Sequence, residues 1–400
     1  MEKVEIILDD DGEPITDPDI LAFIKSRINI PNDLRFPFLS NKISGGREPA
    51  KTQWLLKYFA YRLARPNPSD EECKDYYQRI DIDSDDDINR FRGALLGCAV
   101  GDALGTTLEF KAPGSFDPID DIVGGGPFNL NVGEWTDDTS MMYCLAHSLV
   151  RTQTCDLNDQ ITLYCRWWKD GVFSVNGRCF DIGMTVQAAL ERYQETGDPK
   201  SGDTHSMSAG NGSLMRLAPI PIRYYDSFED AVKFAALSSI TTHAATEAVD
   251  ACRYFSGLLW GALHGESKAV LLDGIYSPIE GYWSENPLCE SITSLVEQAD
   301  YKLKPAAEIR ASGYVMHTLE AVLWSFYGSD DFKSGALKAV NLGEDADTTG
   351  AIYGQLAGAY YGERVIPFQW VRKISKSHVF YLKSEELKEV VIAKRQDVIT

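Results

Sequence analysis

The chain has 400 residues, of which 44% are hydrophobic, and it carries 39 Lys and Arg against 59 Asp and Glu. This composition excludes a disordered or fibrous protein and provides ample chain for a core. The formal net charge of −20 argues against a nucleic-acid coat protein and against binding to anionic membranes. A phosphate-bearing substrate would therefore have to be held by something other than a basic surface.

The first 88 residues differ from the remainder. They open with three acids at 9–11, contain several prolines and an aromatic segment around Trp54, and end in the acidic run 81–87. Because this segment has few apolar residues for a core of its own, the sequence predicts an N-terminal extension over 1–88, either an arm or a small accessory domain. Residues 89–400 then form the main domain.

The sequence also predicts a cytoplasmic protein. The N-terminus lacks the basic and apolar segments of a signal peptide, and no apolar run is long enough to span a membrane. The eight cysteines form no CxxC pair, which is typical of free thiols in a reducing compartment.

From Phe91 onward, apolar residues recur near a period of 3.6, which predicts an all-α fold. Three segments, 93–101, 257–262 and 350–359, are rich in Gly and Ala, so we expect their helices to approach neighbouring helices closely. The other expected helices cover 140–150, 159–168, 182–193, 228–239, 247–263, 287–301, 313–326 and 349–361.

Two similar elements lie far apart in the sequence, GEWTDDTS at 133–140 and GEDADTTG at 343–350. Each places carboxylates and a Thr hydroxyl at a helix start, where a single such side chain is typical of an N-cap. Two clusters, each with more side chains than a cap needs, favour a metal site. Carboxylates and hydroxyls are hard ligands, so they indicate Mg²⁺, Mn²⁺ or Ca²⁺ and disfavour zinc. The candidate ligands are Thr136, Asp137, Asp138, Asp345, Asp347 and Thr348.

Three weaker signals accompany these clusters. Glu109 follows a Gly-rich segment, where an acid is usually an exposed residue at a helix end. The turn Gly210, Asn211, Gly212 and Ser213 could hold a diphosphate through backbone N–H groups, or it could be a simple turn. His243 is either a ligand-binding residue, a cap or a satisfied core residue.

Together and in this order, these elements resemble the ADP-ribosylglycohydrolase family over about residues 90–365. The resemblance implies a large orthogonal helical bundle with a dinuclear Mg²⁺ or Mn²⁺ centre held by the six candidate ligands. It also implies that Asp181 and Glu109 lie near the scissile bond, protonating the leaving group or orienting the water. The loop 210–213 would bind the ADP-ribose diphosphate, and His243 would lie near it.

The activity implied by this resemblance is removal of ADP-ribose from protein side chains. Arginine is the first expected linkage, and serine-linked or small-molecule ADP-ribose are alternatives. Extended members of the family include immunity proteins against ADP-ribosyltransferase toxins, so the extension poses a second hypothesis. In that hypothesis the chain is a stoichiometric inhibitor that binds the toxin through its N-terminal arm, and hydrolysis is secondary.

Overall fold

The computed structural model describes residues 86–399, which belong to a compact unit beginning at Asp83. The predicted extension, 1–88, lies outside the described residues except for its last three. The described part is helical, with only isolated β-bridges, which confirms the all-α prediction. Its α-helices are α5 (Asp86–Gly105), α6 (Asp137–Thr152), α7 (Leu157–Asp170), α8 (Met184–Thr196), α9 (Pro219–Arg223), α10 (Phe228–Ser239), α11 (Thr246–Leu263), α12 (Lys268–Leu271), α13 (Tyr282–Glu285), α14 (Glu290–Gln298), α15 (Val315–Tyr327), α16 (Phe332–Val340), α17 (Ala346–Tyr361), α18 (Phe368–Lys373) and α19 (His378–Ile399).

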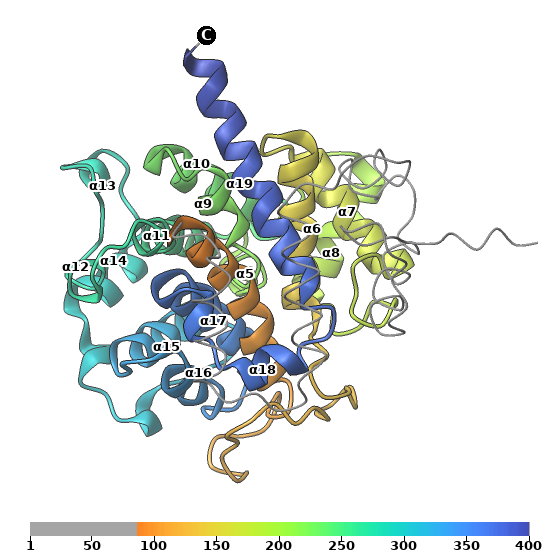
Figure 1. Cartoon of the computed structure of the whole chain (residues 1–400), viewed down its shortest axis with the longest axis vertical. Helices are drawn as coiled ribbons and strands as arrows, with labels where there is room; N and C mark the ends of the chain where they lie inside the picture. The colour runs from red at the N-terminus through yellow and green to blue at the C-terminus, as the bar shows by residue number, and fades with distance from the viewer. Residues whose placement is uncertain (1–85, 400) are drawn as a thin grey trace, which may run out of the picture. The chain divides into compact units, whose positions relative to one another are not determined.

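Helices α5 and α17 form the antiparallel pair at the centre of this unit (Figure 1). Glycines recur every fourth residue along both, and Gly97 lies opposite Gly354 as Gly101 lies opposite Gly350. A methyl group added at any of these positions would come within 3.0 Å of the facing carbonyl oxygen. Only glycine therefore permits this backbone approach, which confirms the prediction for 93–101 and 350–359.

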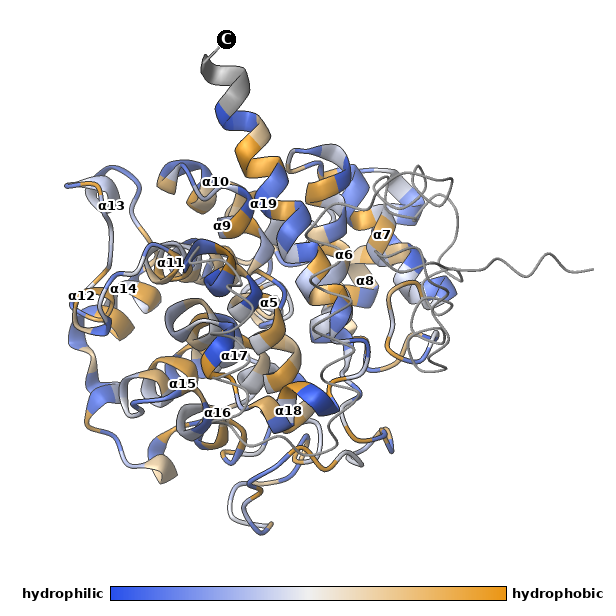
Figure 2. Ribbon diagram, in the orientation of Figure 1, coloured by the Kyte–Doolittle hydropathy of each residue, from blue (hydrophilic) through white to orange (hydrophobic). Residues whose placement is uncertain are grey.

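Other helices surround this pair and bury its apolar side chains. Helices α11, α15 and α16 pack against α17, while α6 and α19 pack against α5. Leu96 and Val100 on α5 and Leu356 on α17 are fully buried. Apolar and polar residues share the same ribbons (Figure 2), as expected for amphipathic helices that each turn one side to the core.

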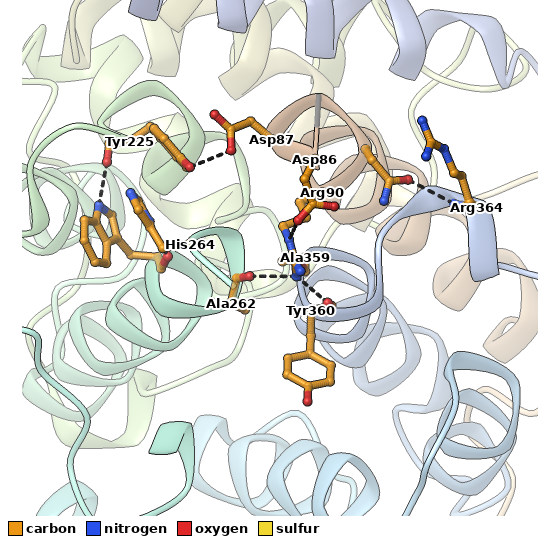
Figure 3. Close-up of polar contacts among 11 residues, drawn as sticks. Asp86, Asp87, Arg90, Tyr225, Ala262, His264, Ala359, Tyr360 and Arg364 are labelled. Carbon is orange, nitrogen blue, oxygen red and sulfur yellow. Dashed lines mark hydrogen bonds and ion pairs between the residues drawn. The ribbon is translucent and has the colours of Figure 1, made fainter. Parts of the chain in front are cut away.

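Arg90, near the start of the described part of α5, ties three helices together (Figure 3). The guanidinium of Arg90 donates to the carbonyl oxygens of Ala262 at 3.1 Å and Ala359 at 3.2 Å, and also to that of Tyr360. These carbonyls belong to the last turns of α11 and α17, which lack the regular hydrogen bonds of a helix interior, although that of Ala262 also accepts from the N–H of Gly265. The half-buried guanidinium of Arg90 thus anchors both helix ends to α5, and its positive charge is favourable beside their negative dipole ends.

The free state of the described cysteines was also expected. All described cysteines are unpaired, and Cys98, Cys144 and Cys252 are buried. Among the helices of this part of the chain, none is both long and apolar enough to cross a membrane.

Candidate functional site

The two predicted ligand motifs meet where α6 and α17 begin. Thr136 and Asp345 occupy the N-cap positions, yet neither side chain caps its own helix. Asp138, Asp347 and Thr348 lie in the first turns and are buried. Ordinary capping therefore does not account for these residues.

Oxygen atoms from both motifs converge. The hydroxyl Oγ1 of Thr136 lies 3.1 Å from Oδ2 of Asp138 and 3.4 Å from Oδ2 of Asp347. Oγ1 of Thr348 also lies 3.4 Å from that same Asp138 oxygen. Neighbouring ligands of an octahedral Mg²⁺, each about 2.1 Å from the ion, are about 3 Å apart. The spacing of these oxygens is therefore close to that of a metal coordination shell.

Asp102, on α5, is a residue of this cluster that the sequence prediction missed. Its carboxylate accepts hydrogen bonds from the backbone N–H groups of Thr136 (2.9 Å) and Thr139 (3.1 Å). It also accepts from both threonine hydroxyls, at 3.0 and 2.6 Å. Asp102 thus serves α6 as an N-cap supplied by another helix. In the sequence, Asp102 is only an acid within a Gly-rich helical segment. Nothing in that local pattern shows which residues it contacts.

Because the Thr136 hydroxyl has a single proton, the bond to Asp102 has a further consequence. If that proton is donated to Asp102, the oxygen lone pairs remain for the side of Asp138 and Asp347. A hydroxyl oriented in this way is a ligand for a cation. Asp102 itself has four donors on its two oxygens, so it supports the cluster and is a poor ligand.

A second acidic group adjoins the first. Carboxylate oxygens of Glu109, Asp181 and Asp347 lie within 4.8 Å of one another. Glu109 is brought there by the turn after α5, since the backbone N–H of Phe110 donates to the carbonyl of Glu344, just before α17. Both residues predicted near the scissile bond therefore adjoin a predicted metal ligand.

Burial and mutual repulsion make these acids hard to ionise together. Burial, followed by repulsion from Asp181, raises the pKa of Glu109 to about 10. Burial, followed by repulsion from Asp345, raises the pKa of Asp181 to about 8. The pKa values of Asp138 and Asp347 are raised for the same reasons. Such a cluster needs either protons or cations to balance its charge.

The residues present fit a divalent metal. Buried carboxylate oxygens of Glu109, Asp138 and Asp347 have no hydrogen-bond partner within the described part of the chain. An unpaired buried carboxylate oxygen is costly, and a hard cation is the partner that such oxygens prefer. Asp137, the remaining predicted ligand, is buried in the first turn of α6, and its pKa is raised by burial and by repulsion from Asp181.

The predicted diphosphate loop, 210–213, contacts this cluster through Asn211. The side-chain amide of Asn211 donates to Oδ2 of Asp345 at 2.7 Å and to Oγ1 of Thr318 at 2.9 Å. The hydroxyl of Ser213 is buried and accepts from Ser239. Both side chains thus have partners in the protein, and what the loop can offer a ligand is its backbone.

Two backbone donors of this loop are free. Among the described residues, the N–H groups of Gly212 and Ser213 have no acceptor, whereas the N–H of Asn211 donates to the carbonyl of Gly313. His243 lies against the same loop, because a methyl group on Gly210 would come 3.3 Å from its Nε2 atom. The imidazole therefore lies against the loop, and the loop in turn contacts the acidic cluster through Asn211. Successive free N–H groups of this kind bind anions.

Comparison with known proteins agrees with this geometry. The family model described as ADP-ribosylglycohydrolase matches residues 83–398. The chain is similar to "ADP-ribosylarginine hydrolase Tri1" of Serratia proteamaculans, at 39% identity over 85% of this chain and 94% of the relative. It is also similar to the Pseudomonas putida protein of the same name, at 38% identity over 85% and 89%.

A more distant relative and a solved structure extend the comparison. The "ADP-ribosyl-[dinitrogen reductase] glycohydrolase" of Rhodospirillum rubrum is 31% identical over 72% of this chain and 90% of its own. A chain of a solved "ADP-ribosylglycohydrolase-related protein complex" superposes with a TM-score of 0.67 at 38% identity. The superposition covers 76% of this chain and 99% of that one.

Proposed function

Since this chain belongs to the ADP-ribosylglycohydrolase family and is a hydrolase, we propose that it releases ADP-ribose from modified arginine side chains of proteins. The observation that carries this proposal is the junction of two buried acidic motifs with an anion-binding turn. A diphosphate would bind at the turn while the glycosidic bond lies over the acids. The negative charge of the protein is then no obstacle to a phosphate-bearing substrate.

We assign two Mg²⁺ or Mn²⁺ ions to the acidic cluster. The protein oxygens that would hold them belong to Thr136, Asp137, Asp138, Asp345, Asp347 and Thr348. When bound, such ions hold vicinal hydroxyls of a sugar and lower the pKa of a water molecule.

The chain's own acids would carry the proton transfers. Glu109 and Asp181 lie beside Asp347, in a group separate from the one that Asp102 forms with Asp138 and Asp347. In glycoside hydrolysis one carboxyl group protonates the leaving atom and another orients the attacking water, while nearby negative charge stabilises the oxocarbenium-like transition state. We assign these two roles to Glu109 and Asp181 as a pair.

Arginine is favoured over serine because the relatives from Serratia and Pseudomonas carry the name of arginine hydrolases. A guanidinium leaving group would also suit a site lined by carboxylates, which bind it through paired hydrogen bonds. Serine-linked and small-molecule ADP-ribose remain the competing substrates in the test below.

The test is release of ADP-ribose from arginine-modified and serine-modified peptides, with Mg²⁺, with Mn²⁺ and with chelator. We expect metal-dependent release from the arginine peptide, and a loss of at least 100-fold in Asp347→Asn, which removes a shared ligand. Asp331→Asn is the matched control, because Asp331 caps α16 away from the cluster. Release from serine alone, or full activity of Asp347→Asn, would contradict the proposal.

The N-terminal extension supports a second candidate function, inhibition of an ADP-ribosyltransferase toxin by direct binding. The alignments to the two arginine hydrolases cover 85% of this chain, which is more than the 318 residues from 83 to 400. Those relatives therefore share part of the extension. If inhibition dominates, full-length Asp347→Asn will still block a transferase at equimolar ratio. If hydrolysis dominates, that variant will give no protection.

We further propose that the chain consists of the extension, 1–88, and a catalytic domain, 89–400, and that it works in the cytoplasm. The free state of the described cysteines supports a reducing compartment.

A further inference from the structure

A buried arginine lies beneath the anion-binding loop and has no acidic partner among the described residues. Arg216 is fully buried, and its guanidinium lies 4.5 Å above the ring of Tyr164. It donates to the carbonyl of Gly212 at 3.0 Å and to the hydroxyls of Thr241 and Thr242 at 3.2 and 2.7 Å. A cation is rarely buried against neutral acceptors alone, so its position calls for an explanation beyond charge pairing.

The hydroxyls of Thr241 and Thr242 donate their protons to different acceptors. A guanidinium can only donate, so Oγ1 of each threonine accepts from Arg216 and keeps its own proton to give elsewhere. Thr241 donates that proton to the carbonyl of Ser238 at 2.7 Å. Among the described residues, the remaining partner of the Thr242 hydroxyl is Nδ1 of His243, at 2.9 Å. Its proton therefore points to the imidazole.

This direction decides the tautomer of His243. If Nδ1 accepts from Thr242, the neutral ring carries its proton on Nε2. Burial, followed by repulsion from Arg216, lowers the pKa of His243 to about 3, which keeps the ring neutral. Backbone hydrogen bonds hold the ring in place. The N–H of His243 donates to the carbonyl of Ser239, and the N–H of Ala244 donates to the carbonyl of Asp203.

The Nε2 atom has no acceptor among the described residues, although only 2% of His243 is exposed. Nε2 lies over the loop, since a methyl group on Gly212 would come 3.1 Å from it. Glycine at 212 is therefore what lets the ring approach the two free backbone N–H groups. Three donors without acceptors, on Gly212, Ser213 and His243, thus gather at one turn.

We propose that Arg216 and Thr242 are positioning residues that fix the proton of His243 on Nε2 and so make the imidazole a neutral donor to a phosphate oxygen at the loop. Neither residue touches the ligand. The proposal rests on the proposed function, because it takes the anion to be the diphosphate of ADP-ribose. The loop then binds the anion with neutral donors, and Arg216 acts on them through Thr242 and the ring and through the carbonyl of Gly212.

The experiment compares Thr242→Val, Thr242→Ser and Thr241→Val in the full-length, metal-loaded protein. Thr242→Val keeps the shape of the side chain but removes the hydroxyl between Arg216 and His243. Thr242→Ser restores that hydroxyl. Thr241→Val is the matched control, since it removes an equivalent acceptor of Arg216 without breaking the link to the imidazole.

Two measurements are made on each variant. The ¹⁵N chemical shifts of labelled histidine report which ring nitrogen carries the proton, with His243→Gln used to assign the signals. Calorimetry gives the affinity for ADP-ribose. We expect a protonated Nε2 in the wild type and in Thr242→Ser, a population protonated on Nδ1 in Thr242→Val, and an affinity at least tenfold weaker in that variant alone.

A wild-type His243 protonated on Nδ1 would overturn the proposal, as would equal losses in Thr241→Val and Thr242→Val, which would indicate a purely structural role. If the wild type binds no ADP-ribose, the proposed function fails, and the nitrogen shifts still decide the proton position. If Thr242→Val does not fold, a loss of affinity in Thr242→Ser as large as tenfold would count against the proposal.

Discussion

Substitution of Asp102 by Asn tests whether this residue positions the metal motif. The carboxylate of Asp102 accepts from two backbone N–H groups and two hydroxyls at the start of α6. Asparagine has nearly the same shape but replaces one acceptor oxygen with an NH₂ group. Because that group cannot accept, about two of the four donors lose their partner, and Thr136 loses its fixed orientation.

The expected effects on stability and on metal affinity differ. Two unsatisfied buried donors cost about 2–6 kcal/mol at 1–3 kcal/mol each. Burial raises the pKa of Asp102 from 3.8 to about 6, and asparagine avoids that ionisation cost of about 3 kcal/mol. The net loss of stability is therefore modest, about 3 kcal/mol at most. Metal affinity should fall about 10–100-fold, as is usual when a partner of a metal ligand is lost.

The assay is titration of the folded, metal-free variant with Mn²⁺ by calorimetry, with thermal unfolding measured in parallel. Asp156→Asn is the control, because Asp156 caps α7 through the N–H of Asp159 and touches none of the acidic cluster. We expect the control to bind Mn²⁺ as the wild type does. Wild-type affinity in a folded Asp102→Asn protein would refute the assignment of Asp102 as a positioning residue.

Three further predictions follow from the site and the central helix pair. Apparent Mn²⁺ affinity should rise with pH between 5 and 8, because Asp181, whose pKa is about 8, and the other raised acids must lose protons to bind metal; calorimetry across this range checks it. In contrast, the stability of the metal-free, chelated protein, measured by thermal unfolding, should fall as pH rises. Its acids have folded pKa values above their unfolded ones, so the folded state binds more protons and its stability falls as pH rises through about 6 to 8. Gly101→Ala should destabilise the protein by about 3 kcal/mol or more in urea unfolding, since its methyl group meets the carbonyl of Gly350, whereas Gly183→Ala, with open space around it, should change stability by under about 1 kcal/mol.

Helix content could be predicted well where one apolar face repeats. The expected segment 228–239 coincides with α10, and the expected 349–361 lies within α17. Two helices of nine residues or more, α16 and α19, were not expected. In α19 the buried face includes Lys383 and Ser384 among its apolar residues, so the polar side chains obscure the pattern.

The residues of the candidate site also divide into those that a local pattern predicts and those that depend on distant partners. Short motifs revealed residues that act through their own helix start, such as Asp138 and Asp347. Sequence could not reveal Asp102, because its four partners belong to a helix more than thirty residues away along the chain. For the same reason, sequence could not reveal that the side chain of Asn211 holds Asp345.

The glycine contacts between α5 and α17 also limit how this protein can change. Glycine recurs every fourth residue, so the two helices can be displaced along each other only in steps of four residues, about 6 Å. A metal shell tolerates displacements of about 0.2 Å. Asp102, which holds the start of α6, lies on α5, and Asp347 lies on α17. Mutations therefore cannot adjust the distance between the two ligand motifs by a small sliding of these helices. We expect divergence in substrate choice to arise in the loops around the site, while the relative position of α5 and α17 stays the same.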